Sequence, residues 1–182
     1  MKACFMGLGY IGLPTAIIAA EHGIEVIGVD INPQVVDMTN QGLIHIVEPG
    51  LQDLCRKLVT SGHLKASVKP ETSDVYLVVV PTPFKGNHEP DISYVETATR
   101  SVIPLLKEND LFIIESTSPV GTTDKMTDLI FSLRPELKGK IYIAYCPERV
   151  LPGNVIYELV HNDRVIGGIN PESTEKAIGF YS

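Results

Sequence analysis

The stretch Lys2-Ala3-Cys4-Phe5-Met6-Gly7-Leu8-Gly9-Tyr10-Ile11-Gly12 decides the fold of this chain. An apolar run at 3–6 leads into glycines at positions 7, 9 and 12, and a second apolar stretch, 13–20, follows directly. This order predicts a buried strand, a tight glycine turn and a helix packed against the strand.

Each glycine of the turn has its own mechanical reason. Gly7 permits the tight turn, Gly9 lets the backbone approach a pyrophosphate, and Gly12 lets the helix and strand pack closely. The N–H groups of Tyr10 and Ile11 then face the phosphates at the positive end of the helix dipole. The alternative is a glycine-rich turn that only packs.

An acidic residue stands where a nucleotide ribose is expected. Asp30 ends a second strand pattern, Glu25-Val26-Ile27-Gly28-Val29, downstream of the glycine turn. Its carboxylate can accept hydrogen bonds from a ribose diol and would repel the 2′-phosphate of NADP. Together with the glycine turn, Asp30 predicts a dinucleotide-binding unit whose cofactor is NAD.

Composition and charge are those of an ordinary globular chain of 182 residues. A hydrophobic fraction of 44% supplies a full core, and this length is typical of one domain. The net charge is −7, from 15 basic and 22 acidic side chains, and no basic cluster interrupts it. We therefore expect no nucleic-acid partner and no membrane partner.

The cysteines point to a reduced setting. Cys4, Cys55 and Cys146 are odd in number and widely spaced, and they form no CxxC pair. This pattern favours neither a metal site nor a disulfide framework. We expect a cytoplasmic protein without a bound metal.

Strand and helix patterns alternate along most of the chain. The predicted strands are 3–6, 25–30, 65–68, 74–80, 111–115, 141–145 and 164–167. The predicted helices are 10–22, 33–40, 51–61, 92–107 and 122–133. These patterns predict an α/β fold in which a doubly wound, mostly parallel Rossmann-like sheet carries helices on both faces.

Three unusual loops follow predicted strands. They are 81–91, 116–121 and 146–153. Because the carboxyl ends of parallel strands lie at one edge of a sheet, we expect all three loops to meet where such sheets bind ligands.

The first two loops offer hydroxyl groups. Thr82 lies between two prolines, and its hydroxyl either contacts the cofactor or belongs to a turn that the prolines only rigidify. Ser116 and Thr117 end a strand. Thr122 or Thr123 then either caps the next helix or faces the nicotinamide or phosphates.

The third loop offers charged groups. Glu148 at the edge of a cleft can act as a general base. Arg149 can hold a diphosphate or a carboxylate in a fork. The alternative is a surface ion pair between these two side chains, which is common and weak. For Cys146, next to Pro147, we expect a packing role.

Two other groups of polar residues have structural interpretations. His45 and Glu48 lie in a long connection and can border the cofactor, but a structural loop with a capping role is favoured. A second group precedes a short predicted strand, where we expect an Asp–Arg pair or a helix-capping role. It comprises His161, Asn162, Asp163 and Arg164.

With these loops in view, the chain resembles the UDP-glucose/GDP-mannose dehydrogenase family. The matching motifs are GLGYIGLP, the GVD that ends at Asp30, VPTP, STSPVGTT and the PE of Pro147-Glu148. Further stretches resemble the subgroup that acts on UDP-N-acetyl-D-mannosamine. They are IHIVEP, VPTPFKGNHEPD, ESTSPVG, YCPERVLPGNV and NDRVIGG.

The resemblance implies a four-electron oxidation. A sugar-nucleotide C6 alcohol becomes a carboxylate with two NAD+, through an aldehyde and a cysteine thioester that water hydrolyses. By position, NAD-binding roles are implied for Gly7, Gly9, Tyr10, Ile11, Gly12, Asp30, Thr82 and Thr123. Thr117 matches a threonine that positions water or substrate, and Glu148 matches the glutamate of thioester hydrolysis. Arg149, Val150 and Leu151 match substrate-contacting positions.

Two departures from the family pattern matter. UDP-glucose dehydrogenases carry a second glutamate where this chain has Pro152, which favours the mannosamine subgroup. The family's catalytic cysteine, lysine and helical asparagine lie beyond Ser182, so the resemblance implies that this chain alone is inactive. Residues 1–182 are then the NAD-binding domain, with 170–182 starting the connection to a central helix and a second domain. The full-length form is expected to be a homodimer.

Three alternatives stay open. The substrate can be UDP-glucose or another nucleotide sugar. The chain can be a stand-alone NAD-binding module without chemistry, which gives no reason for Thr117, Glu148 or Arg149. It can also be a dehydrogenase of the short hydroxy-acid type, which does not predict the CPERVLPG stretch.

Overall fold

A seven-stranded sheet forms the centre of the protein in the computed structural model, which describes residues 1–86, 88–151 and 153–182. The strand order is β3-β2-β1-β4-β7-β8-β9, and every pair is parallel except β8 with β9. The strands are β1 Lys2–Met6, β2 Glu25–Val29, β3 Leu64–Ser67, β4 Val75–Val78, β7 Leu111–Ile114, β8 Tyr142–Tyr145 and β9 Gly167–Gly168. The predicted doubly wound, mostly parallel sheet is therefore confirmed.

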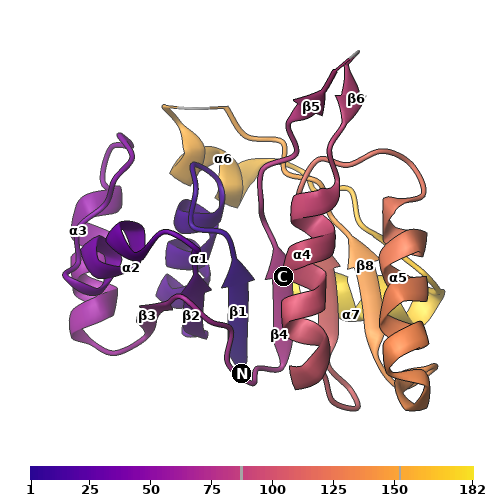
Figure 1. Ribbon diagram of the computed structural model, residues 1–182. Coiled ribbons are helices and arrows are strands. Elements are labelled where there is room, and N and C mark those ends of the chain that lie inside the picture. Colours follow the sequence, from indigo (N-terminus) through magenta and orange to yellow (C-terminus); the bar gives the residue numbers. More distant parts are fainter. Residues whose placement is uncertain (87, 152) are drawn as a thin grey trace.

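Helices cover both faces of this sheet (Figure 1). One face packs against α1, α3 and α7, and the opposite face packs against α4 and α5. Helix α2 lies beside β3 and α3, and α6 packs against α1. The bounds are α1 Gly12–Glu21, α2 Pro33–Asn40, α3 Leu51–Thr60, α4 Ser93–Val102, α5 Thr122–Leu133, α6 Val155–His161 and α7 Pro171–Tyr181. Short 3₁₀ turns, η1 and η2, span Ile103–Leu105 and Pro135–Leu137.

Burial on both faces explains why the central strands are apolar throughout. In β1, Ala3 and Phe5 face the cluster under α1 and α3, while Cys4 and Met6 face the cluster under α4 and α5. All four residues are buried. Successive side chains of a strand point to opposite faces, so a sheet covered twice requires apolar residues at every position.

Several predicted boundaries are corrected. The predicted helix 92–107 ends at Val102 and continues as η1, because Pro104 has no N–H for an α-helical hydrogen bond. The predicted strand 164–167 is wrong, since the strand is only Gly167–Gly168 and runs antiparallel to β8. A side chain at Gly168 would lie 2.4 Å from the backbone nitrogen of Thr174, so this strand passes very close to α7.

Some elements had no clear periodic signal. These are the two helices α6 and α7 and a small hairpin of β5 Phe84–Lys85 and β6 Glu89–Pro90, which extends beyond the sheet after β4 (Figure 1). Among the described residues, no helix is both long and apolar enough to cross a membrane.

Candidate functional site

The carboxyl ends of the parallel strands meet at one edge of the sheet. Met6 at the end of β1 is in register with Val29 of β2 and with Val78 of β4, and Val78 is in register with Ile114 of β7. The strand order reverses between β1 and β4, which is the point where open α/β sheets bind ligands. The glycine turn and the three unusual loops all follow these strand ends.

Two glycines of the turn are required by packing. Gly7 has a φ of +108°, and a Cβ there would lie 2.3 Å from the carbonyl oxygen of Val79. A Cβ at Gly12 would lie 2.0 Å from the carbonyl oxygen of Gly7. Around Gly9, in contrast, a Cβ would meet nothing within 4 Å, so the turn is open at this position.

Asp30 is tied to the glycine turn. Its Oδ2 accepts a hydrogen bond from the backbone N–H of Leu8 at 3.0 Å, and its Oδ1 accepts one from Asn32 at 2.9 Å. Each carboxylate oxygen keeps a free lone pair for a ribose hydroxyl. The turn and the carboxylate are therefore placed together as one unit.

Two adjoining cavities lie above the strand ends and share Gly9, Val79, Val80 and Pro81. The larger has a volume of about 570 Å³, and Asp30 and Gly7 line it together with apolar groups. These groups are Ile31, Val68, Pro70, Tyr94 and Ala98. The smaller has a volume of about 270 Å³ and is lined by more polar residues, including Tyr10, Thr82, Thr117 and Glu148. Because they share these four residues, the two cavities form one cleft with an apolar part beside Asp30 and a more polar part beside Glu148.

This cleft fits a dinucleotide. The apolar cavity suits an adenine ring next to Asp30, the open backbone at Gly9 suits a pyrophosphate, and the polar cavity suits the nicotinamide end. The open backbone at Gly9 and the position of Asp30 beside the turn agree with the prediction from the glycine motif.

Thr82 joins two of the loops. Its hydroxyl donates a hydrogen bond of 2.7 Å to the carbonyl oxygen of Thr117, and both residues line the polar cavity. The hydroxyl of Ser116 also donates to the carbonyl oxygen of Val80 at 2.8 Å. The loops after β4 and β7 are thus held side by side.

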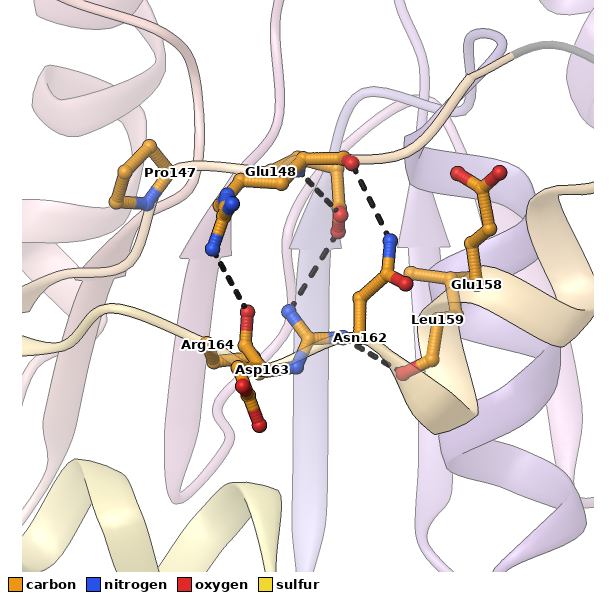
Figure 2. Close-up of a pocket in the computed structure, with 8 residues that line it drawn as sticks. Pro147, Glu148, Glu158, Leu159, Asn162, Asp163 and Arg164 are labelled. Carbon is orange, nitrogen blue, oxygen red and sulfur yellow. Dashed lines mark hydrogen bonds and ion pairs between the residues drawn. The ribbon is translucent and has the colours of Figure 1, made fainter.

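Glu148 forms no ion pair with its neighbour Arg149. Its Oε1 accepts the backbone N–H of Arg149 at 2.7 Å, while the Arg149 guanidinium donates to the carbonyl oxygen of Asp163 at 3.3 Å. The partner of Glu148 is Arg164, whose Nη1 lies 3.5 Å from Glu148 Oε2 (Figure 2). The alternative of a surface pair between Glu148 and Arg149 is therefore wrong.

Glu115 is a site residue that the sequence reasoning missed. Its side chain is fully buried at the end of β7, lines the polar cavity and accepts a hydrogen bond from the Tyr181 hydroxyl. Arg164 Nη1 lies 3.9 Å from its Oε1. Burial raises the pKa of Glu115 to about 7, although Tyr181 and Arg164 oppose the shift. The signal in the sequence that could have identified Glu115 was its position at the start of the ESTSP stretch, residues 115–119.

Five of the predicted site residues line neither of the two cavities, namely Gly12, Thr123, Arg149, Val150 and Leu151. Thr123 is in the first turn of α5, where its carbonyl oxygen accepts from Thr127, and neither Thr122 nor Thr123 caps the helix because Gly121 occupies the cap position. Val150 and Leu151 follow Arg149 outside the cavity linings, and Leu151 is exposed. Pro152, the departure from the UDP-glucose pattern, lies outside the described residues.

Glu48 has the structural role that was favoured for it. Its carboxylate is buried and accepts the N–H groups of Gly153 at 3.1 Å and Val155 at 2.7 Å. It therefore caps the start of α6 from a distant part of the chain.

Comparison with known proteins identifies the class of this domain. The family model described as UDP-glucose/GDP-mannose dehydrogenase family, NAD binding domain, matches residues 1–182. The chain therefore belongs to the UDP-glucose/GDP-mannose dehydrogenase family and is its NAD-binding domain.

Individual relatives agree with this class. The chain is 52% identical to the NDP-N-acetyl-D-galactosaminuronic acid dehydrogenase of Ralstonia nicotianae over 97% of its own length and 44% of the relative's. It is 52% identical to the UDP-N-acetyl-D-mannosamine dehydrogenase of Campylobacter jejuni over 99% of its length and 46% of the relative's. The structure of the UDP-N-acetyl-mannosamine dehydrogenase of Staphylococcus aureus superposes with a TM-score of 0.95 at 44% identity, over the whole of this chain and 45% of the other. The chain thus spans less than half the length of these relatives.

Proposed function

We propose that this chain is the NAD-binding part of a nucleotide-sugar 6-dehydrogenase, which oxidises the C6 alcohol of UDP-N-acetyl-D-mannosamine to a carboxylate with two NAD+. The observation that carries the proposal is the cleft that the two adjoining cavities form at the glycine turn. Its apolar end reaches Asp30, and its polar end reaches Thr117 and Glu148.

NAD supplies a hydride acceptor for each of the two oxidation steps. We assign its pyrophosphate to the backbone of Gly7, Gly9, Tyr10, Ile11 and Gly12, and its adenosine ribose to Asp30. Thr82 contributes a contact at the polar end. Thr123 stays a prediction from the resemblance, since α5 begins outside the two cavities.

Glu148 and Thr117 are the proposed catalytic side chains. Glu148 accepts a proton from the water that hydrolyses the thioester, and Thr117 helps to position that water or the substrate. Both residues line the same cavity, which supports a shared task. We assign the cysteine that forms the thioester to a part of the longer protein that this chain does not span.

Arg149, Val150 and Leu151 are proposed to contact the substrate. Arg149 and Leu151 are exposed in this domain, so they are free to meet a nucleotide sugar held between two domains. Two relatives of equal identity carry names for different amino sugars. Another nucleotide sugar is the second candidate.

The proposed setting is a longer protein. We propose that residues 170–182 lead into a central helix and a second domain, that the full-length form is a homodimer, and that it works in the cytoplasm. The proposal of a longer protein is supported by the coverage, since this chain matches less than half of each relative's length.

Calorimetric titration of this chain with NAD+ and with NADP+ tests the cofactor assignment. We expect NAD+ to bind and NADP+ to bind at least about tenfold more weakly, because Asp30 repels the extra phosphate. The chain alone should form no NADH with UDP-N-acetyl-D-mannosamine, and steady NADH formation by it would contradict the proposal.

The full-length protein tests the chemistry. It should form two NADH for each UDP-N-acetyl-D-mannosamine consumed, and UDP-glucose is the comparison substrate. In the Glu148→Gln variant, the substrate should still transfer its first hydride to NAD+. Hydrolysis of the thioester should be about 100-fold or more slower than in the wild type. Unchanged kinetics in that variant would contradict the role of Glu148 in thioester hydrolysis, whereas a wild type that binds NAD+ but forms no NADH would favour a binding module without chemistry.

A further inference from the structure

A cluster of buried and half-buried polar side chains lies next to Glu148, and none of the roles above uses it. It consists of Glu115 at the end of β7, Arg164 before β9 and Tyr181 at the end of α7. These residues lie far apart in the sequence, and the fold brings them together beside Glu148, with Glu115 lining the polar cavity.

We infer that Arg164 is a positioning residue, which holds the Glu148 carboxylate at the polar cavity and is itself held by Glu115 and Tyr181. This inference rests on the proposed function, since it concerns the side chain to which thioester hydrolysis is assigned.

The geometry places Arg164 between two carboxylates. Its Nη1 lies 3.5 Å from Glu148 Oε2 and 3.9 Å from Glu115 Oε1, and its guanidinium carbon lies 4.5 Å from the centre of the Tyr181 ring. Figure 2 shows Glu148 and Arg164 reaching toward each other from separate segments of chain. The Arg164 side chain is only 19% exposed, so its charge is little screened by water.

The two carboxylates share one cation. Glu115 Oε2 and Glu148 Oε2 are buried, and neither accepts a hydrogen bond from a described residue. Two buried carboxylates with a single guanidinium carry a net negative charge, which a low-dielectric site disfavours. One added proton restores neutrality, and it belongs on Glu115, the more deeply buried of the two.

The groups that face Glu115 come from three other segments. Tyr181 donates to it from α7, Arg164 attracts it from the segment before β9, and Glu148 repels it from the loop after β8. Cys146 lies in the same cluster, where burial and then Glu115 raise the pKa of its thiol. When Glu115 is protonated, Glu148 is the only one of the two carboxylates that pairs with the Arg164 guanidinium. When Glu115 is ionised, the two carboxylates compete for that guanidinium.

A titration of this chain tests the cluster without any turnover. With ¹³C-labelled glutamate, NMR should show Glu115 titrating near neutral pH, and the signal should disappear in Glu115→Gln. Glu148→Gln removes a repelling carboxylate and should lower the midpoint of the Glu115 titration by about one pH unit. Arg164→Gln and Tyr181→Phe remove groups that stabilise ionised Glu115, so each should raise that midpoint by about one pH unit.

Two variants serve as matched controls. Arg134→Lys changes a partly buried arginine that donates to the carbonyl oxygens of Ile103 and Leu106, away from the site. Tyr142→Phe removes a hydroxyl from a residue beside α7 that has no hydrogen-bonding partner among the described residues. Neither should move the midpoint. If Glu148→Gln and Arg164→Gln also leave it unmoved, the cluster is not coupled and the inference is overturned.

The full-length protein tests the positioning role. Arg164→Lys should lower kcat for carboxylate formation about tenfold or more, with the KM for NAD+ nearly unchanged. Glu115→Gln should remove an inflection near neutral pH from the kcat profile. If the kcat of Arg164→Lys equals that of the control variant Arg134→Lys, the inference is contradicted. If the wild type oxidises no nucleotide sugar, the proposed function fails while the titration still decides the coupling.

Discussion

Asp30 Oδ2 accepts a hydrogen bond of 3.0 Å from the backbone N–H of Leu8, so the acid that ends β2 also holds the glycine turn after β1. Leu8 is fully buried, and its N–H has no route to water. The residue that we assign to ribose recognition therefore has a structural role as well.

Asp30→Ala is expected to weaken both NAD+ binding and folding. The variant leaves the Leu8 N–H unsatisfied, which costs about 1–3 kcal/mol of unfolding free energy. Asp30→Asn keeps an oxygen acceptor and should retain most of that stability while still losing affinity. Urea unfolding and calorimetry measure the two effects, and equal stability of the alanine variant and the wild type would disprove the structural role.

Alanine at two glycines of the turn should separate folding from binding. Gly12→Ala places a Cβ 2.0 Å from the carbonyl oxygen of Gly7 and should destabilise the domain by about 3 kcal/mol. Gly9→Ala meets no atom within 4 Å, so its stability should stay within about 1 kcal/mol of the wild type. Because the new methyl group enters the cleft, NAD+ affinity should still fall by about tenfold. A Gly9→Ala protein with unchanged affinity would place the pyrophosphate elsewhere.

Removal of the Glu48 cap should destabilise α6 and the loop before it. Glu48→Ala leaves the buried N–H of Val155 without its acceptor, at a cost of about 1–3 kcal/mol. Glu48→Gln retains one carbonyl oxygen and should lose less. Hydrogen exchange of α6 amides shows the effect locally, with α5 amides as the internal control. Exchange that increases equally in both helices would argue against a local cap.

The stability of the domain should fall as the pH rises from about 4.5 to about 7. Burial raises the pKa of Glu115 from 4.5 to about 7 in the folded state, so the folded chain holds a proton that the unfolded chain has released. Linkage then lowers the unfolding free energy by at most about 3 kcal/mol across this interval. Below this pH interval Glu115 is protonated in both the folded and the unfolded state, and above it Glu115 is ionised in both states.

Glu115→Gln should remove this slope. The unfolding free energy of the variant relative to that of the wild type should increase by about 1–3 kcal/mol between pH 5 and pH 8, as measured by urea unfolding. Glu108→Gln, a change at an exposed carboxyl, should follow the wild type at both pH values. A constant difference between Glu115→Gln and the wild type would mean that Glu115 is ionised in the fold throughout.

Local patterns in the sequence were sufficient for the parallel strands of the sheet and for the cofactor end of the site, but not for β9. The apolar runs of β1, β2, β4, β7 and β8 and the amphipathic helices between them carry periodic signals, and the glycine spacing with Asp30 needs only adjacent elements. Helices α6 and α7 escaped prediction because α6 is short and α7 carries a weak apolar stripe interrupted by glycine.

Tertiary structure alone decided which charges meet. Pairing of Glu148 with Arg164 instead of Arg149, burial of Glu115 under Tyr181 and capping of α6 by Glu48 all join residues from separate segments. A sequence shows which groups carry charge, and the periodicity of its neighbours shows which strand ends bear them. Distance and burial determine how strongly those groups interact, and both arise only when the helices have packed onto the sheet.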